Sequence, residues 1–232
     1  GASGTDIEFT GTLTGSEEKT DCPVITIKSE KEATSLNYDD CAKLILNGVK
    51  LTAAENTSLF IIGENTKPLC IQATSESTLK CKATDKNSPY VIKNYQGGIL
   101  LLDGGDAGLN IIGEGGKSHG IYLYTTSSTV NGILKGKINI VADDEYAVSI
   151  GNTATLSAAE DAKITASAGK KAILDNNVKS PFLRWEFEAA PEPDKTLEIK
   201  DVNGKSFSPA IQFKTDGNNK SFAINVTKGT GY

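Results

Sequence analysis

The sequence predicts an all-β protein: a parallel β-solenoid with three short strands per coil, followed by a C-terminal antiparallel β cap. Three observations support this fold class. Similar segments recur at intervals near thirty residues, each carries apolar residues at matching positions, and Gly, Asn, Asp, Lys or Ser bounds nearly every expected strand. Apolar residues at helical spacing are absent, so we expect no long helix.

The coils are expected to occupy residues 25–180 of the 232-residue chain. Five repeats align on their first strands, with starts 30, 30, 29 and 26 residues apart, at Val49, Leu79, Leu109, Ile138 and Ile164. Each repeat contains an apolar strand, a polar or glycine-bearing turn and a second apolar strand, and a less regular third strand fills the remainder. One coil cannot bury its own apolar face, so stacked neighbours must complete the core.

The second strand of each repeat carries a column of β-branched residues that we expect to point inward. Its members are Ile61, Val91, Ile121, Val148 and Ile173. Side chains alternate between the two faces of a strand, so one strand position should face the interior in every coil. Burial of each such side chain stabilises the fold by roughly 1.5–3 kcal/mol.

The two ends of the chain differ from the repeats. Residues 1–24 contain the alternating segment IEFTGTLTG, which predicts an N-terminal capping strand. Residues 181–232 contain FLRWEFEAA, TLEIKD, AIQFKTD and SFAINVTKG, where apolar and polar residues alternate as in strands with one wet face. We expect these strands to form an antiparallel cap over the last coil, because an uncovered edge would pair with other chains. A separate small domain is the alternative.

The composition excludes several classes of partner. The chain has 24 basic and 29 acidic residues, a net charge of −5, and Arg184 as its single arginine. Its lysines are scattered, so we expect no nucleic-acid partner. No apolar run is long enough to span a bilayer, so membrane contact is expected only through a lipid anchor or a removed segment. The oligomeric state is not predicted.

The four cysteines do not predict a metal site. Cys22, Cys41, Cys70 and Cys81 form no CxxC pair, and His119 is the single histidine of the chain. We therefore expect no metal and no cofactor. Buried free thiols and one or two disulfides both remain open, because each cysteine lies within or beside an apolar strand.

The repeats VKLTAAENTSLFIIGEN, LNIIGEGGKSHGIYLYT and ITASAGKKAILDN resemble the right-handed parallel β-helix repeats of the pectin-lyase-like superfamily. They are similar in particular to those of the carbohydrate-binding-domain-like surface proteins of gut bacteria. The resemblance covers roughly residues 25–176. It implies a right-handed coil, a secreted or cell-surface location on a bacterial envelope, and an affinity for glycans.

Two motifs raise the alternative of a polysaccharide-cleaving enzyme, either a hydrolase or a lyase. Ser118-His119-Gly120 is similar to the SHG motif of pectin hydrolases, and Asp143-Asp144 resembles their paired carboxylates. Here, however, the Asp pair follows the SHG segment instead of preceding it, and the family's other catalytic motifs are missing. We therefore expect no catalytic residue.

The segment DGGDAG raises a separate question about calcium. Asp103 and Asp106 could supply oxygen ligands, but two carboxylates are too few for this cation, which takes six to eight. Turns rich in Asp and Gly are common at solenoid corners. We favour the turn.

The tyrosines of the second strands are the predicted ligand-binding residues. Tyr90, Tyr122 and Tyr124 are expected to point outward, with Tyr95 and Tyr146 nearby in stacked coils. Exposed aromatic rings are apolar platforms with polar edges that suit sugar rings. We predict a non-catalytic, secreted or cell-surface recognition module that binds a glycan weakly along one outer face. A structural stalk or adhesin spacer, in which the tyrosines only pack together, is the remaining alternative.

Overall fold

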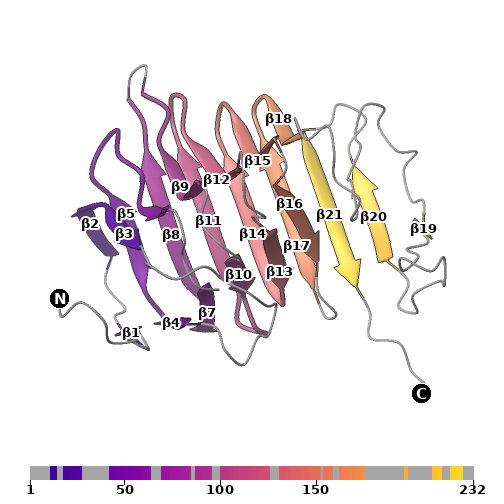
Figure 1. The fold of residues 1–232 in the computed structure, drawn as a ribbon, viewed down its shortest axis with the longest axis horizontal. Coiled ribbons are helices and arrows are strands. Elements are labelled where there is room, and N and C mark those ends of the chain that lie inside the picture. The colour runs from indigo at the N-terminus through magenta and orange to yellow at the C-terminus, as the bar shows by residue number, and fades with distance from the viewer. Residues whose placement is uncertain are drawn as a thin grey trace.

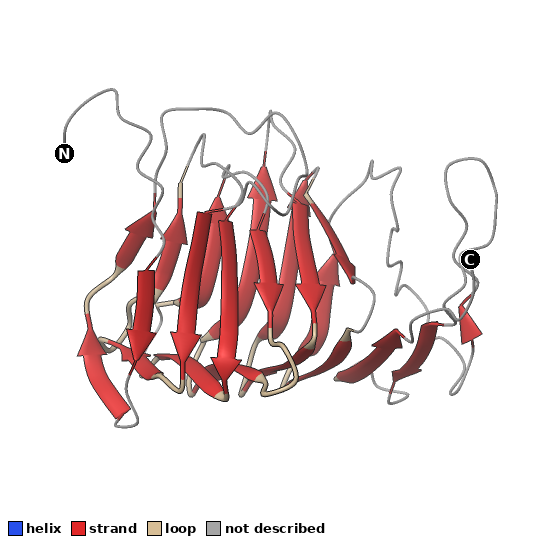
Figure 2. Ribbon diagram, turned by 90° about the horizontal axis from the view of Figure 1, so that it is seen from below, coloured by secondary structure: helices blue, strands red, loops and turns tan. Residues whose placement is uncertain are grey.

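The computed structural model shows an all-β parallel β-solenoid, as the sequence predicted (Figure 1). It describes residues 11–14, 18–27, 42–63, 69–84, 87–95, 100–125, 131–152, 154–158, 162–175, 196–197, 211–215 and 220–226. No helix occurs within these ranges. Strands that are distant in the sequence lie side by side in neighbouring coils (Figure 2).

The parallel strands fall into three sheets, which we name A, B and C. Sheet A contains β1 (Gly11–Thr14), β4 (Ala42–Asn47), β7 (Leu69–Ser75), β10 (Leu100–Asp103), β13 (Asn131–Lys135) and β16 (Thr155–Ala158). Sheet B contains β2 (Glu18–Cys22), β5 (Lys50–Ala53), β8 (Ser77–Lys82), β11 (Leu109–Glu114), β14 (Lys137–Ala142) and β17 (Lys163–Ala168). Sheet C contains β3 (Ile25–Ile27), β6 (Phe60–Ile62), β9 (Tyr90–Tyr95), β12 (His119–Thr125), β15 (Tyr146–Asn152) and β18 (Lys171–Asp175).

The apolar core lies between the three sheets and consists of register-matched side chains. In sheet B, Ile111 pairs with Leu79 on one side and with Ile140 on the other, and all three are fully buried. In sheet C, Ile121 pairs with Val148, and both are buried. Val148 in turn pairs with Ile173, so the last three members of the predicted inward column share one register.

The predicted column is wrong for Ile61, and Val91 is buried as predicted but lies outside the column's register. Ile92, not Val91, pairs with the column in β9, and Ile92 pairs in turn with Phe60 of β6. Ile61 instead pairs with Lys93 and is only partly buried. A shift of one residue moves a side chain to the opposite face of its strand, which is why Ile61 is not inside.

The corner between sheets A and B requires glycine at two positions. A Cβ atom on Gly104 would overlap the carbonyl oxygen of Lys137 in the next coil. Gly136 has a φ of +65°, and a Cβ atom there would lie 2.5 Å from the amide nitrogen of Gly105. Only glycine combines this left-handed conformation with such a close approach. The two corners therefore hold Lys137 against the turn that precedes β11.

The chain ends were expected to cap the solenoid. Within residues 1–24, β1 and β2 pair in parallel with β4 and β5, so parallel pairing extends upstream of residue 25. Ile7 and Phe9 lie outside the described residues. At the other end, sheet B continues through antiparallel strands in the order β21 (Ser221–Val226), β20 (Ile211–Thr215) and β19 (Thr196–Leu197). The segment FLRWEFEAA lies outside the described residues.

Three of the four cysteines can be assigned a redox state. Cys22, Cys70 and Cys81 are thiols outside any disulfide bond, and Cys70 and Cys81 are buried. Cys41 lies outside the described residues. The free-thiol alternative therefore holds for these three residues.

Candidate functional site

A stack of aromatic rings on the outside of sheet C is the leading candidate for a functional surface. Tyr122 and Tyr124 alternate along β12 with the buried residues Ile121 and Leu123, so the two tyrosines face outward. Parallel pairing brings rings from adjacent strands into register at a strand spacing of about 4.8 Å. That spacing is short enough for face-to-face stacking. The structure brings together all five tyrosines that were predicted to bind a ligand.

The stack is continuous and also includes His119. Successive ring centroids lie 5.8, 4.6, 4.9, 5.9 and 5.3 Å apart, in the order Tyr146, His119, Tyr90, Tyr122, Tyr124 and Tyr95. The angles between neighbouring ring planes range from 3° to 30°. These separations fall in the range that aromatic pairs prefer, where each pair contributes about 0.5–1.5 kcal/mol beyond its buried area.

An irregularity at the start of β9 lets Tyr90 join the stack. Val91 and Ile92 are consecutive and both fully buried, whereas Tyr90 and Lys93 on either side of them are partly exposed. The regular inward and outward alternation is therefore interrupted at this point. As a result, Tyr90 reaches the ring of Tyr122 although their sequence positions do not pair.

The Tyr95 end of the stack is the most exposed. Tyr95 is 39% exposed, and its ring stacks on that of Tyr124. Gly63 directly follows β6 at the position next to Tyr95 in register, and it brings no side chain against the ring. On the opposite side, the Tyr124 ring covers Gly151, because a Cβ atom on Gly151 would lie 2.6 Å from Cδ2 of Tyr124.

Two lysines lie over the stack. The Nζ atom of Lys93 is 5.9 Å from the centroid of the Tyr90 ring and 5.6 Å from that of Tyr95. At the other end, Nζ of Lys170 lies 5.0 Å from the centroid of Tyr146 and 3.2 Å from Oε2 of Glu145. These distances are within the range of cation–π attraction. The Lys93 ammonium therefore adds positive charge near the Tyr95 end of the stack, whereas Glu145 balances the charge of Lys170 at the Tyr146 end.

The surroundings of the phenols keep them protonated. Burial, and then the charges of the neighbouring phenols, raise the pKa of Tyr122 to about 12. Burial, and then the nearby Glu145 carboxylate, also raise the pKa of Tyr90. A neutral phenol both donates and accepts hydrogen bonds. These groups can therefore bond to sugar hydroxyls at physiological pH.

His119 is part of the stack, and its side chain is buried. Burial lowers the pKa of its imidazole; Glu145 opposes this effect and Lys170 adds to it. Its Nδ1 atom has no hydrogen-bond partner among the described residues. Its backbone carbonyl accepts a hydrogen bond from Sγ of Cys81 at 3.5 Å, and burial raises the pKa of that thiol to about 12. Cys81 therefore carries almost no thiolate at neutral pH.

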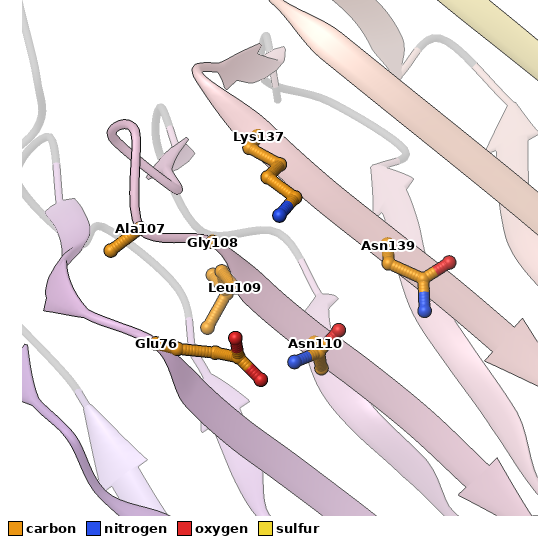
Figure 3. A pocket seen from close by; sticks show the side chains of 7 residues that line it. All are labelled: Glu76, Ala107, Gly108, Leu109, Asn110, Lys137 and Asn139. Atoms are coloured by element: carbon orange, nitrogen blue, oxygen red, sulfur yellow. The ribbon is translucent and has the colours of Figure 1, made fainter.

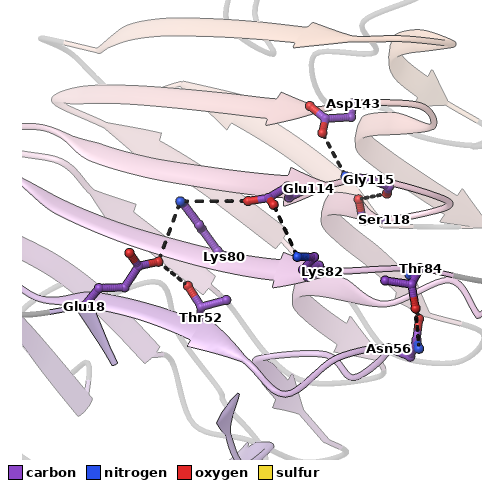
Figure 4. A network of polar contacts seen from close by, with 10 residues as sticks. All are labelled: Glu18, Thr52, Asn56, Lys80, Lys82, Thr84, Glu114, Gly115, Ser118 and Asp143. Atoms are coloured by element: carbon purple, nitrogen blue, oxygen red, sulfur yellow. Dashed lines mark hydrogen bonds and ion pairs between the residues drawn. The ribbon is translucent and has the colours of Figure 1, made fainter. Parts of the chain in front are cut away.

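The other residues of the hydrolase-like motif are used in turns. Oγ of Ser118 donates to the carbonyl of Gly115 at 2.7 Å, and the amide of Gly115 donates to Oδ2 of Asp143 at 2.8 Å (Figure 4). Asp144 is exposed in the same turn as Asp143. The charges that shift the pKa of His119 come from Glu145 and Lys170, and the Asp143 carboxylate instead bonds to the Gly115 amide.

The Asp103 carboxylate is engaged in the turn that was favoured for it. Its Oδ1 accepts a hydrogen bond from the Gly105 amide at 2.9 Å. Its Oδ2 accepts one from Nε2 of Gln72 at 3.2 Å and lies 3.7 Å from Nζ of Lys135. Asp106 is exposed in the turn. In the described part of the chain, no group of three or more His, Cys, Asp or Glu residues could hold a metal ion.

The outside of sheet B carries a row of ion pairs instead of aromatic rings (Figure 4). Nζ of Lys80 lies 3.8 Å from Glu18 and 4.0 Å from Glu114, and Nζ of Lys82 lies 3.8 Å from Glu114. Oγ1 of Thr52 also donates to Glu18 at 3.0 Å. The acidic partners are nearly half exposed, so these pairs are typical surface ion pairs.

A small polar pocket near the corner of sheets A and B was not predicted. It has a volume of about 140 Å³ and is lined by Glu76, Ala107, Gly108, Leu109, Asn110, Lys137 and Asn139 (Figure 3). One signal in the sequence could have revealed it. Asn110 and Asn139 occupy the same position in the aligned segments LNI and INI, and they are register partners in β11 and β14.

A scan against protein-family models, a search of the curated proteins and a search of the solved structures each found no match. Among the described residues, no helix is long and apolar enough to cross a membrane.

Proposed function

We propose that this protein is a non-catalytic recognition module that binds a glycan weakly along the tyrosine stack of sheet C. The observation that carries the proposal is the continuous row of six rings that ends in the exposed Tyr95. A sugar ring would stack its C–H face on Tyr95, as apolar sugar faces do on aromatic platforms. Lys93 and the neighbouring phenols would donate hydrogen bonds to its hydroxyl groups.

The rigidity of the stack supports binding despite its shallow shape. Each ring is held by its neighbours and by parallel strands, so little side-chain entropy would be lost on binding. The faces of the inner rings are already covered by other rings, so they would contribute edges and hydroxyls. We therefore expect weak affinity, with a Kd on the order of 1 mM per site.

Three finer features belong to the same proposal. The coil is right-handed, as crossover connections between parallel strands nearly always are. The antiparallel strands β19 to β21 cap the open edge of sheet B. The protein acts outside the cell, secreted or displayed on a bacterial envelope, as the resemblance to surface β-helix proteins implies.

A structural stalk is the second candidate, and one observation favours it. Face-to-face stacking between register partners is also the arrangement expected if the rings serve only to tie adjacent coils together. In that case the rings stabilise the solenoid and bind nothing.

Retention on a glycan array distinguishes the two candidates. Tyr95→Ala removes the exposed end of the stack, and Val24→Ala is its control because Val24 is similarly exposed, at 38% against 39%. We expect Tyr95→Ala to lower retention at least about fivefold. Tyr95→Phe should retain most of the binding, and Val24→Ala should not differ from the wild type. Failure to retain any glycan, or equal retention by Tyr95→Ala, would overturn the proposal in favour of the stalk.

A further inference from the structure

Four polar side chains converge on the pocket at the corner of sheets A and B. Glu76 lies between β7 and β8, Asn110 is in β11, and Lys137 and Asn139 are in β14. Figure 3 shows them around the backbone of Gly108 and Leu109. Three coils thus contribute one or more groups each, and the parallel register fixes their relative positions.

Most of these groups have unused hydrogen-bonding capacity. Among the described residues, the side chains of Glu76, Asn110 and Lys137 make no hydrogen bond or ion pair. Oδ1 of Asn139 accepts a hydrogen bond from Oγ1 of Thr165 at 2.8 Å, which leaves the Asn139 amide NH₂ to donate. On the same sheet, by contrast, Lys80 forms ion pairs with Glu18 and Glu114, so the charges of those groups are already paired (Figure 4).

The pocket combines polar groups with a small apolar floor. A Cβ atom built on Gly108 would lie 3.5 Å from Cδ of Lys137, so the lysine stem lies across the glycine backbone. Gly108 has a φ of +113°, a conformation that other residues rarely adopt, and this keeps a side chain out of the pocket. Ala107 completes the apolar part of the lining, and the Leu109 side chain lies beneath it, buried in the core.

The charges that line the pocket cancel, because Glu76 contributes one negative and Lys137 one positive charge. Neither an anion nor a cation is favoured by the net charge. Two carboxamides, a carboxylate and an ammonium together offer both donors and acceptors. Vicinal hydroxyl groups need this mixture, and the C–H face of a sugar ring matches the apolar floor.

We propose that this pocket is a binding site for a single neutral sugar residue. Asn110 and Asn139, which lie on adjacent strands about 4.8 Å apart, bond its hydroxyl groups, while Glu76 accepts and Lys137 donates at the rim. The site is on sheet B and uses none of the sheet C tyrosines. It therefore stands or falls independently of the glycan site proposed at Tyr95.

Titration of the full-length protein with methyl glucoside, methyl mannoside, methyl galactoside and N-acetylglucosamine tests the site. Two-dimensional NMR reports directly on the side-chain NH₂ groups of Asn110 and Asn139. We expect at least one of these sugars to shift both signals at millimolar concentrations. The double variant Asn110→Ala/Asn139→Ala should lose affinity about tenfold or more, whereas Lys50→Ala, an exposed change two strands from Asn110 and three from Asn139, should not.

Two further variants distinguish this pocket from the tyrosine stack and from a site for charged ligands. Tyr95→Ala should bind the sugar at this pocket as the wild type does, whatever the glycan array shows. Glu76→Gln leaves Lys137 as the one charge in the lining, so its affinity for glucuronate should rise above that of the wild type. The proposal is overturned if no neutral sugar shifts the Asn110 and Asn139 signals at tens of millimolar. It is also overturned if the wild type binds glucuronate, an anion, or free glycine, a zwitterion, more tightly than any neutral sugar. The same holds if the double variant binds the neutral sugar as tightly as the wild type does.

Discussion

The outer faces of sheets C and B have the same spacing between coils but carry different kinds of side chain. On sheet C, Tyr90 stacks on His119 and Tyr95 stacks on Tyr124, so register partners cover one another. On sheet B, the register partners Lys82 and Glu114 approach to 3.8 Å and remain partly exposed to water. A repeated strand thus turns any recurring residue into a ladder. Whether that ladder stabilises the fold depends on the interaction between its residues: ring stacking on sheet C or ion pairing on sheet B.

The largest effect on stability should come from the buried core side chains beneath the two outer faces, where sheets B and C are alike. Leu123 of β12 and Ile111 of β11 are both fully buried. Leu123→Ala and Ile111→Ala should each lower the free energy of unfolding by about 2–5 kcal/mol, through lost burial and the cavity left behind. Urea unfolding measures both, with an unchanged m value as the control.

If only one of these two variants is destabilised, the sheets do not share one core. Differences between their outer faces could then not be compared directly, because the core beneath each sheet would contribute differently to the free energy of unfolding.

An intermediate effect should separate the outer faces themselves. Tyr122 contacts two rings, those of Tyr90 and Tyr124, so Tyr122→Ala should cost about 1–3 kcal/mol. Lys80→Ala removes two long ion pairs between partly exposed groups and should cost about 0–1 kcal/mol. Thermal unfolding of the two variants beside the wild type measures the difference.

Salt and a conservative variant sharpen this test. High salt should erase the Lys80→Ala effect, since exposed charges are screened, but not the Tyr122→Ala effect. Tyr122→Phe keeps the ring and should be close to the wild type in stability. A cost for Lys80→Ala that equals that of Tyr122→Ala would contradict the distinction between aromatic and charged ladders.

The solenoid and most of its strands could be predicted because apolar alternation and corner residues are local signals. Register was harder. Ile61 is β-branched and lies thirty residues before Val91, which predicts that it points inward, but the turn lengths vary, and Phe60 takes the position instead. A similar slip affects Leu79, which aligns with Leu109 in the sequence but pairs with Ile111. That slip is of two residues, so the side chains stay on the predicted face.

The candidate sites also divide into features with a local sequence signal and features that depend on how the coils stack. The tyrosines could be predicted because they recur in the same strand of successive repeats, although their mutual stacking depends on a register that residue spacing determines only approximately. Glu76 could not be assigned to the pocket, because it lies in a junction between two strands and shares the pocket with Lys137 only through the stacking of different coils. Sites assembled from corners of different coils leave little local signal.

The smallest effect should be the pH dependence of stability that arises from His119, which lies on sheet C and has no counterpart on sheet B. Burial lowers the pKa of the folded-state imidazole below its usual 6.5, so on acidification the unfolded chain takes up the proton first. Stability should therefore decrease as the pH falls below about 6.5 and level off below the folded-state pKa. His119→Phe keeps a ring between Tyr90 and Tyr146 without a titrating group, so this variant should lose less stability than the wild type over that range. Melting temperatures across the interval measure the difference, with Lys80→Ala as a control that should follow the wild type. If His119→Phe loses as much stability as the wild type, the acid sensitivity arises elsewhere, and the imidazole acts in the stack only as a flat ring.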